Sequence, residues 1–343
     1  MHRAAGEGGV ASVASGQDQA RGSSTTRPRP ASARPLRVVL AGEEAAGAQT
    51  LRLLHETGQQ VVGVLTGGPG AERSSGPLAS LAEGWGYRVW PARRVREPAF
   101  ADELRSEGVE LLLNVHSLYV VKREVLAAPR IGSFNVHPGP LPEYAGLNAP
   151  SWAILHGERV HGVTVHWMDA GIDTGEIAYE ARFEISPQDT AFTLSAKGVR
   201  AAMPLLRQLL EAAAAEPPAI PRQKQRAVPG RYFGREAPNG GRVDWAAPAA
   251  QVERFVRAAD YWLFASPWGA PRATLPSVGE IEIVKVTCTG ETAAEAPGTI
   301  GGSDAGGVRV ACGDEWLLVQ SVRIDGKPSD LLPLLGARAF ELR

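Results

Sequence analysis

Short apolar runs alternate with amphipathic stretches through the first half of the chain. Residues 36–42 form an apolar run that ends in glycine and predicts a buried parallel strand, and residues 60–66 predict a second one. Between them, residues 45–57 carry apolar positions at helical spacing. This order of strand, helix and strand indicates a Rossmann-like α/β fold with a mostly parallel sheet. The turn after the first strand lacks a G-x-G-x-x-G pattern, so it predicts no dinucleotide site.

The same alternation continues to about residue 215. Further strands are predicted at residues 87–90, 111–115, 133–137, 162–168 and 177–183, and helices at 78–86, 98–108, 123–128, 149–156 and 190–215. The continuous apolar run at 111–115 predicts a central strand. Open α/β sheets bind ligands at the carboxyl edge of their strands, so we expect a site where strands 111–115 and 133–137 end.

The pattern changes after residue 215. A polar connector spans 216–240, and its part 222–235 contains five basic residues and no acid. From residue 241, a short extended segment at 243–245 and a helix at 249–259 precede alternating segments at 281–288, 308–312 and 316–324, which predict a small, OB-like β-barrel. We therefore expect four parts: a disordered extension at 1–35, an α/β domain at 36–215, a basic linker at 216–240 and a β-barrel domain at 241–343.

The composition narrows the class of protein. The net charge of −1 gives no overall attraction to nucleic acid or to anionic membranes. No apolar run reaches the roughly eighteen residues of a membrane span, and two cysteines are typical of a reducing compartment, so we expect a cytoplasmic protein. The sequence has no H-E-x-x-H motif, close Cys/His cluster or G-x-S-x-G motif, so it predicts no metal site and no serine nucleophile.

Two groups of polar residues follow predicted strands. Asn135 and His137 are two positions apart, so they project from the same face of a strand. An amide can donate to an oxyanion and an imidazole can move a proton, although a polar pair in a surface turn is an equally open interpretation. Asp169 and Asp173 lie in a glycine-flanked loop and could be turn residues, unless one of them orients His137. His166 is interpreted as a hydrogen-bonded supporting group.

Two motifs carry a family resemblance. N-x-H-P-G-x-L-P-x-Y-x-G begins at residue 135, and G-V-T-x-H-x-M-D-x-G-I-D-T-G begins at residue 162. Together they resemble the folate-dependent formyltransferases, which include methionyl-tRNA formyltransferases and sugar N-formyltransferases. The resemblance runs from about residue 36 to the C-terminus and includes G-R-V-D-W after the linker and A-C-G-D in the last domain.

The resemblance implies an enzyme that uses N10-formyltetrahydrofolate as formyl donor and needs no metal. It implies a catalytic trio of Asn135, His137 and Asp173. Attack of an amine on the formyl carbon would place charge on the formyl oxygen, where Asn135 and protonated His137 could donate; such a donor contributes about 3 kcal/mol in similar sites. The pterin is expected against Tyr119, Val120 and Val121 and against Ala170, Gly171, Ile172 and Thr174 of the second motif.

The acceptor is the open question. The loop at 67–77 has one arginine and one glutamate, which poorly suits an acceptor stem, and Glu143 suits a cationic amine, with Tyr144 beside it as a second candidate substrate contact. We therefore expect a small or carrier-held primary amine or hydroxylamine, as in specialised metabolism. The alternatives are initiator methionyl-tRNA, which the basic connector and the barrel favour, a formyltetrahydrofolate hydrolase, and a non-catalytic folate binder. The sequence assigns no oligomeric state.

Overall fold

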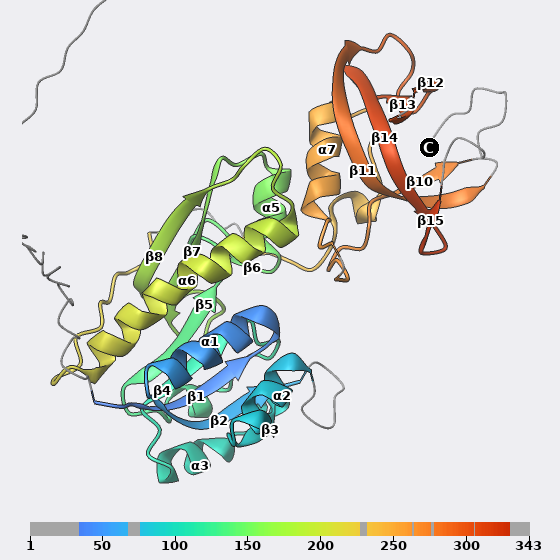
Figure 1. Ribbon diagram of the computed structural model, residues 1–343. Coiled ribbons are helices and arrows are strands. Elements are labelled where there is room, and N and C mark those ends of the chain that lie inside the picture. Colours follow the sequence, from blue (N-terminus) through green and yellow to red (C-terminus); the bar gives the residue numbers. More distant parts are fainter. Residues whose placement is uncertain are drawn as a thin grey trace, which may run out of the picture. The chain divides into compact units, whose positions relative to one another are not determined.

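The computed structural model describes residues 34–67, 76–226, 232–262, 264–275, 278–304 and 306–329 (Figure 1). The expected extension at 1–35 falls almost entirely outside this part of the chain, as does most of the loop at 67–77.

A seven-stranded sheet forms the first domain, with strand order β3-β2-β1-β4-β5-β7-β8 (Figure 1). The first five strands of this order are parallel, whereas β7 and β8 are antiparallel to their neighbours. The mostly parallel sheet that the sequence predicts is therefore confirmed. The strands are β1 (Arg37–Gly42), β2 (Gln60–Thr66), β3 (Val89–Pro91), β4 (Leu111–Val115), β5 (Gly132–His137), β7 (Val160–Trp167) and β8 (Ile177–Glu184).

Both faces of this sheet are covered by apolar packing. Val38 and Leu40 of β1 belong to one buried cluster, and Val39 and Ala41 belong to another, because successive residues of a strand point to opposite faces. This is why β1 and β2 are largely apolar along their length. The helices of this domain are α1 (Glu44–Glu56), α2 (Pro77–Gly84), η1 (Ala92–Arg96), α3 (Phe100–Ser106), α4 (Arg123–Leu126), α5 (Ala149–Leu155) and α6 (Ala191–Ala214).

The connector is bonded to the first domain rather than passing freely between two domains. Gln223 forms an antiparallel bridge with Ile177 through two backbone hydrogen bonds of 2.8 and 3.0 Å. Farther along, β9 (Tyr232–Phe233) pairs in parallel with β6 (Ala145–Gly146). The sequence predicts neither strand, because a two-residue strand has no detectable period.

The last domain is β-rich and antiparallel. Its six strands follow the order β10-β11-β14-β13-β12, with β15 paired to β14. Among the described residues the pairings form an open path from β10 to β12. Next to the short segment at 243–245, an isolated parallel bridge joins Arg242 to Arg272. The elements are η2 (Pro238–Gly241), α7 (Ala249–Ala258), β10 (Arg272–Leu275), β11 (Gly279–Thr292), β12 (Ile300–Asp304), β13 (Gly307–Ala311), β14 (Glu315–Ile324) and β15 (Lys327–Ser329).

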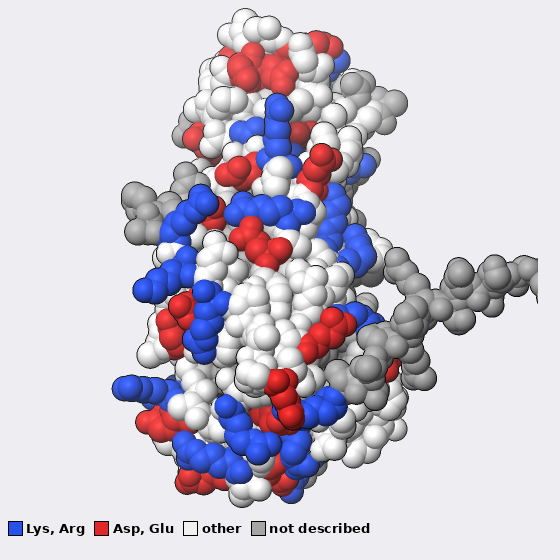
Figure 2. Space-filling model, turned by 90° about the vertical axis from the view of Figure 1, so that its left-hand side faces the viewer, with Lys and Arg blue, Asp and Glu red and all other residues white. Residues whose placement is uncertain are grey.

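Charges of both signs are interspersed on the face shown in Figure 2. This matches the near-zero net charge of the chain. Within the described ranges, no helix combines the length and the apolar character that crossing a membrane requires.

Candidate active site

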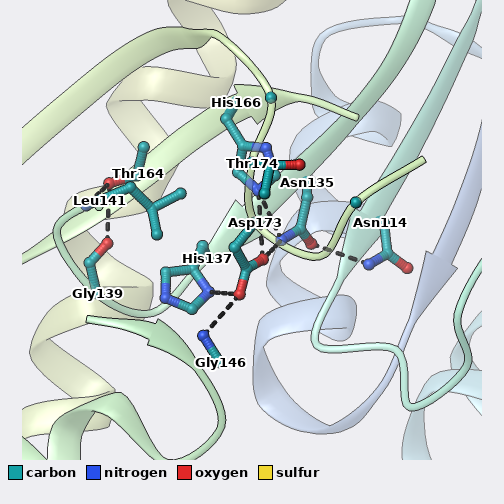
Figure 3. Close-up of polar contacts among 12 residues, drawn as sticks. Asn114, Asn135, His137, Gly139, Leu141, Gly146, Thr164, His166, Asp173 and Thr174 are labelled. Carbon is teal, nitrogen blue, oxygen red and sulfur yellow. Dashed lines mark hydrogen bonds and ion pairs between the residues drawn. The ribbon is translucent and has the colours of Figure 1, made fainter. Parts of the chain in front are cut away.

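A row of polar side chains crosses three neighbouring strands at the carboxyl edge of β4 and β5. Asn114 of β4 is the register partner of Asn135 of β5, and Asn135 is the partner of His166 of β7. Register partners project from the same face of a sheet, so these three side chains lie side by side (Figure 3). The loop after β7 brings Asp173 over this row.

Hydrogen bonds fix the orientation of the Asn135 amide. Nδ1 of His166 donates to the carbonyl oxygen of Trp167 at 2.8 Å, and in the tautomer with its proton on Nδ1 the other ring nitrogen, Nε2, is an acceptor. Nδ2 of Asn135 donates to this Nε2 at 3.0 Å and to Oδ1 of Asp173 at 3.4 Å. Oδ1 of Asn135 accepts from Nδ2 of Asn114 at 2.9 Å. The N–H groups of Asn135 therefore face the loop that contains Asp173.

Asp173 is held in an unusual backbone conformation. Its φ of 57° lies in the left-handed region, which non-glycine residues seldom adopt. Oδ2 accepts a hydrogen bond of 2.9 Å from the backbone N–H of Gly146. Burial raises the pKa of Asp173, but the nearby His166 and His137 and the Gly146 N–H lower it by more, so the pKa lies below its ordinary value. Asp173 is therefore a carboxylate at neutral pH.

His137 faces this carboxylate from the end of β5. Its Nε2 donates to the carbonyl oxygen of Tyr144 at 2.6 Å, and its Nδ1 lies 3.4 Å from Oδ2 of Asp173. Burial lowers the pKa of His137 by more than Asp173 and Tyr144 raise it. The neutral ring therefore keeps its proton on Nε2, and the proton-free Nδ1 points at Asp173. The sequence-predicted trio thus meets in space, while the role of each member stays a prediction.

The loop around Asp173 is braced from two sides. Asp169 accepts hydrogen bonds from the Gly171 N–H at 3.0 Å and from the Thr174 hydroxyl at 2.6 Å, which is the turn role considered for it. Gln225 of the connector donates to the carbonyl oxygens of Asp173 and Gly175 at 2.7 and 2.8 Å. No local feature of the sequence marks Gln225, because its partners lie about fifty residues away.

Sequence reasoning also passed over Asn114 and Gly146. Asn114 had a signal, because it is the one polar residue in an otherwise apolar strand. Gly146 had none, because it contributes only a backbone N–H. His116 lies just beyond Asn114 with a φ of 58°, and burial, with a smaller repulsion between protonated His116 and protonated His137, lowers its pKa to about 4.

The residues expected to contact the pterin differ in exposure. Val120 and Ile172 are exposed apolar side chains, at 66% and 48%. Tyr119 is half-buried, and the Val121 side chain is part of the core, so only its backbone could face a ligand. The remaining candidates, Ala170, Gly171 and Thr174, are exposed in the loop that carries Asp173.

Glu143 and Tyr144, the two candidate substrate contacts, both have side-chain partners in the folded protein. Oε1 of Glu143 lies 3.3 Å from Nη2 of Arg182, so part of its charge is already matched. Tyr144 is buried, and its hydroxyl donates to Oε1 of Glu158 at 2.9 Å. Its contribution to the site is the backbone carbonyl that orients His137.

No metal centre is visible in the part of the chain that the structure describes, since no group of three or more His, Cys, Asp and Glu side chains is placed to bind an ion. The polar row instead offers donors, a buried carboxylate and a neutral imidazole within hydrogen-bonding or ion-pair distance of one another. Such an arrangement can stabilise an oxyanion and move a proton.

Known protein families match both domains. The family described as formyl transferase matches residues 36–210, and the formyl transferase C-terminal domain matches residues 237–331. A methionyl-tRNA formyltransferase of Symbiobacterium thermophilum is 32% identical over 299 residues, which cover 85% of this chain and 89% of that protein. A methionyl-tRNA formyltransferase of Pseudomonas syringae is 30% identical over 311 residues, covering 89% and 95%.

Solved structures share the fold. The N-formyltransferase of Helicobacter canadensis, in complex with folinic acid and dTDP-3-aminofucose, has a TM-score of 0.62 at 20% identity and covers 83% of this chain and 99% of its own. HypX of Aquifex aeolicus, in complex with tetrahydrofolic acid, has a TM-score of 0.61 at 17% identity, covering 88% and 47%. With both domains matched, and with relatives of 30% identity or more covered over about nine tenths of their length, this chain belongs to the formyltransferase family.

Proposed function

We propose that this enzyme transfers a formyl group from N10-formyltetrahydrofolate to a primary amine by direct attack of the amine. The observation that carries the proposal is the meeting of Asn135, His137 and Asp173 at the carboxyl edge of the sheet, with Asp173 within 3.4 Å of both other side chains. The role of each side chain follows from the hydrogen-bond donors and acceptors that it has available for the substrates.

Asn135 is the proposed oxyanion donor. One of its N–H groups bonds to His166 at 3.0 Å, whereas the contact with Asp173 is longer, at 3.4 Å. The second N–H is therefore the one that can turn toward the formyl oxygen as charge develops there. A preorganised donor of this kind contributes about 3 kcal/mol, or roughly a hundredfold in rate.

His137 is the proposed proton carrier. Its Nδ1 has no proton in the neutral ring and can accept one from the attacking amine, directly or through water. The Asp173 carboxylate then stabilises the imidazolium that forms. His137 next gives one proton to the departing N10, so the proton lost by the amine balances the proton gained by the folate.

The structure fits a folate beside these residues. Leu118, Val120 and Ile172 are large apolar side chains that stay exposed in the segments next to the polar row, and a flat pterin would cover apolar surface of this kind. The formyl group that the folate supplies would then lie within reach of Asn135 and His137.

The acceptor that the relatives favour is the amino group of methionyl-tRNA. The two relatives with that name align over nearly their whole length, and both domains take part. The connector also places exposed Arg222 and Lys224 beside the start of β8, next to the loop that carries Asp173, because Gln223 between them pairs with Ile177; Arg222 forms an ion pair of 3.0 Å with Glu176 there. Basic side chains in this position suit a phosphate backbone.

A small or carrier-held amine is the second candidate. Oε2 of Glu143 is buried and has no hydrogen-bond partner among the described residues, so this carboxylate retains capacity for a cationic group. The loop at 67–77 contains one arginine and one glutamate, so it offers little positive charge to an RNA. This also favours a small or carrier-held amine. Arg182 weakens the argument, because it already pairs with the other oxygen of Glu143.

One assay separates these acceptors. Formyl transfer from labelled N10-formyltetrahydrofolate is measured with methionyl-tRNA and with a panel of small amines and carrier-bound aminoacyl groups, at several salt concentrations. We expect kcat/KM to be highest for methionyl-tRNA and to fall with salt. A higher value for a small or carrier-bound amine would establish the second candidate. Formate release at the full rate without any amine would instead show a hydrolase and contradict the proposal.

A further inference from the structure

Asn114 is a buried polar residue in the middle of the sheet. It lies in β4, where every other residue is apolar, and only 8% of its surface is exposed. Its Nδ2 donates to Oδ1 of Asn135 at 2.9 Å. Its own Oδ1 is buried and has no hydrogen-bond partner in the described part of the chain. Leaving a buried carbonyl unpaired destabilises a fold, so packing alone would favour a leucine or valine here.

The single hydrogen bond of Asn114 supports the orientation of the Asn135 amide in which its N–H groups face His166 and Asp173. An amide can rotate by half a turn and exchange its oxygen and nitrogen. On one side of Asn135 lie Oδ1 of Asp173, which accepts, and Nε2 of His166, which accepts in the tautomer that donates from Nδ1 to the Trp167 carbonyl. On the other side lies Asn114, which must then donate. Rotation of Asn135 would point its oxygen at two acceptors and its N–H groups away from the proposed formyl site.

We propose that Asn114 is a positioning residue that keeps the N–H groups of Asn135 directed at the reacting formyl oxygen. The inference rests on the proposed role of Asn135 as oxyanion donor. Asn114 acts in two ways: it pairs the oxygen of Asn135, and it polarises the amide, which makes the opposite N–H a stronger donor. Asn114 itself does not touch the substrate.

The decisive variant is Asn114→Asp, which keeps the shape and replaces the donor by an ionisable group. As a carboxylate it only accepts, so Asn135 turns its N–H groups toward it and away from the formyl site. As a neutral carboxylic acid it can donate to Oδ1 of Asn135 and restore the native orientation. We expect kcat to fall about thirtyfold at pH 8, with the donor KM changed less than threefold. The ratio of variant to wild-type kcat should rise as pH falls, because burial raises the pKa of the introduced carboxyl.

Asn114→Leu is the matched control, since leucine has nearly the same shape and no polar group. It should lose kcat to a similar extent, at every pH. If Asn114 had only a structural role, the ratio of variant to wild-type kcat would not depend on pH for Asn114→Asp while staying constant for Asn114→Leu. If the Asn114→Asp protein does not fold, Asn114→Leu still tests the inference, because a positioning role lowers kcat and leaves the donor KM nearly unchanged.

The outcomes separate this inference from the proposed function. If Asn135→Ala loses kcat but both Asn114 variants keep the wild-type value, Asn114 is not a positioning residue. A kcat ratio for Asn114→Asp that stays constant between pH 8 and pH 5.5 would also overturn the inference. If Asn135→Ala itself keeps full kcat, the proposed role of Asn135 is wrong, and the inference that rests on it is overturned too.

Discussion

The side-chain amide of Gln225 donates a hydrogen bond of 2.7 Å to the backbone carbonyl of Asp173. A second bond of 2.8 Å joins the same nitrogen to the carbonyl of Gly175. The two bonds hold both sides of a left-handed backbone turn, whose φ at Asp173 is 57°. The connector thus contributes to the geometry of the candidate active site, which a passive linker would not do.

Replacing Gln225 by alanine should loosen the Asp173 turn. Each neutral hydrogen bond contributes about 1 kcal/mol, so we expect kcat to fall roughly tenfold and the free energy of unfolding to fall by about 1–2 kcal/mol. Steady-state kinetics and urea unfolding measure both quantities. Gln223→Ala is the control: Gln223 is exposed and bonds to Ile177 through its backbone, so its side chain should be dispensable. Equal kcat values for both variants would refute the bracing role.

Replacing Asp173 by asparagine should impair catalysis because the amide cannot stabilise an imidazolium as a carboxylate does. An asparagine oxygen can still accept from the Gly146 N–H, so the loop is expected to keep its shape. We expect kcat to fall roughly a hundredfold with little change in folate affinity, measured by single-turnover kinetics and by fluorescence titration. Asp169→Asn, in the same loop, should retain most of the wild-type kcat. A wild-type rate for Asp173→Asn would exclude this residue from the proton transfer.

The pH dependence of kcat should follow the protonation of His137. Burial lowers the pKa of His137 from its ordinary value, and the Asp173 charge opposes this shift. Since the proposed reaction needs a proton-free Nδ1, kcat should decline only below the ordinary histidine range, as His137 becomes protonated. Removing the Asp173 charge should move this acid limb to still lower pH. A limb that moves to higher pH in Asp173→Asn would contradict the assignment to His137.

His161 should make the folded protein sensitive to acid. It is buried, its Nε2 donates to the carbonyl of Pro138 at 2.9 Å, and burial lowers its pKa from 6.5 to about 4. The unfolded chain therefore binds a proton that the folded chain excludes, and the stability that the neutral ring contributes is lost as pH falls from 6.5 toward 4. The expected slope of the free energy of unfolding approaches 1.4 kcal/mol per pH unit for this residue.

Urea unfolding between pH 7 and pH 5 measures this slope in the wild type and in His161→Gln. The variant should show a shallower dependence on pH, whatever its absolute stability. A slope equal to that of the wild type would show that His161 does not contribute to the acid sensitivity.

Several features could be predicted from the sequence because they depend on local pattern. The apolar run at 111–115 and the amphipathic helix at 190–215 appear in the structure as β4 and α6, since burial of one face imposes a period on the sequence. The two-residue spacing of Asn135 and His137 placed both on one face of β5. The motif around Asp173 indicated the third member of the trio, and the matched families confirm the formyltransferase assignment.

Only the tertiary structure decided how these side chains are held. The register that aligns Asn114 with Asn135 depends on how two strands, separated by a helix, pack side by side. The N–H of Gly146 and the amide of Gln225 reach Asp173 across 27 and 52 residues of chain. Sequence by itself determined which residues could do the chemistry, because residue type and period are local. Their orientation depends on hydrogen bonds between distant segments, which exist only once the chain has folded.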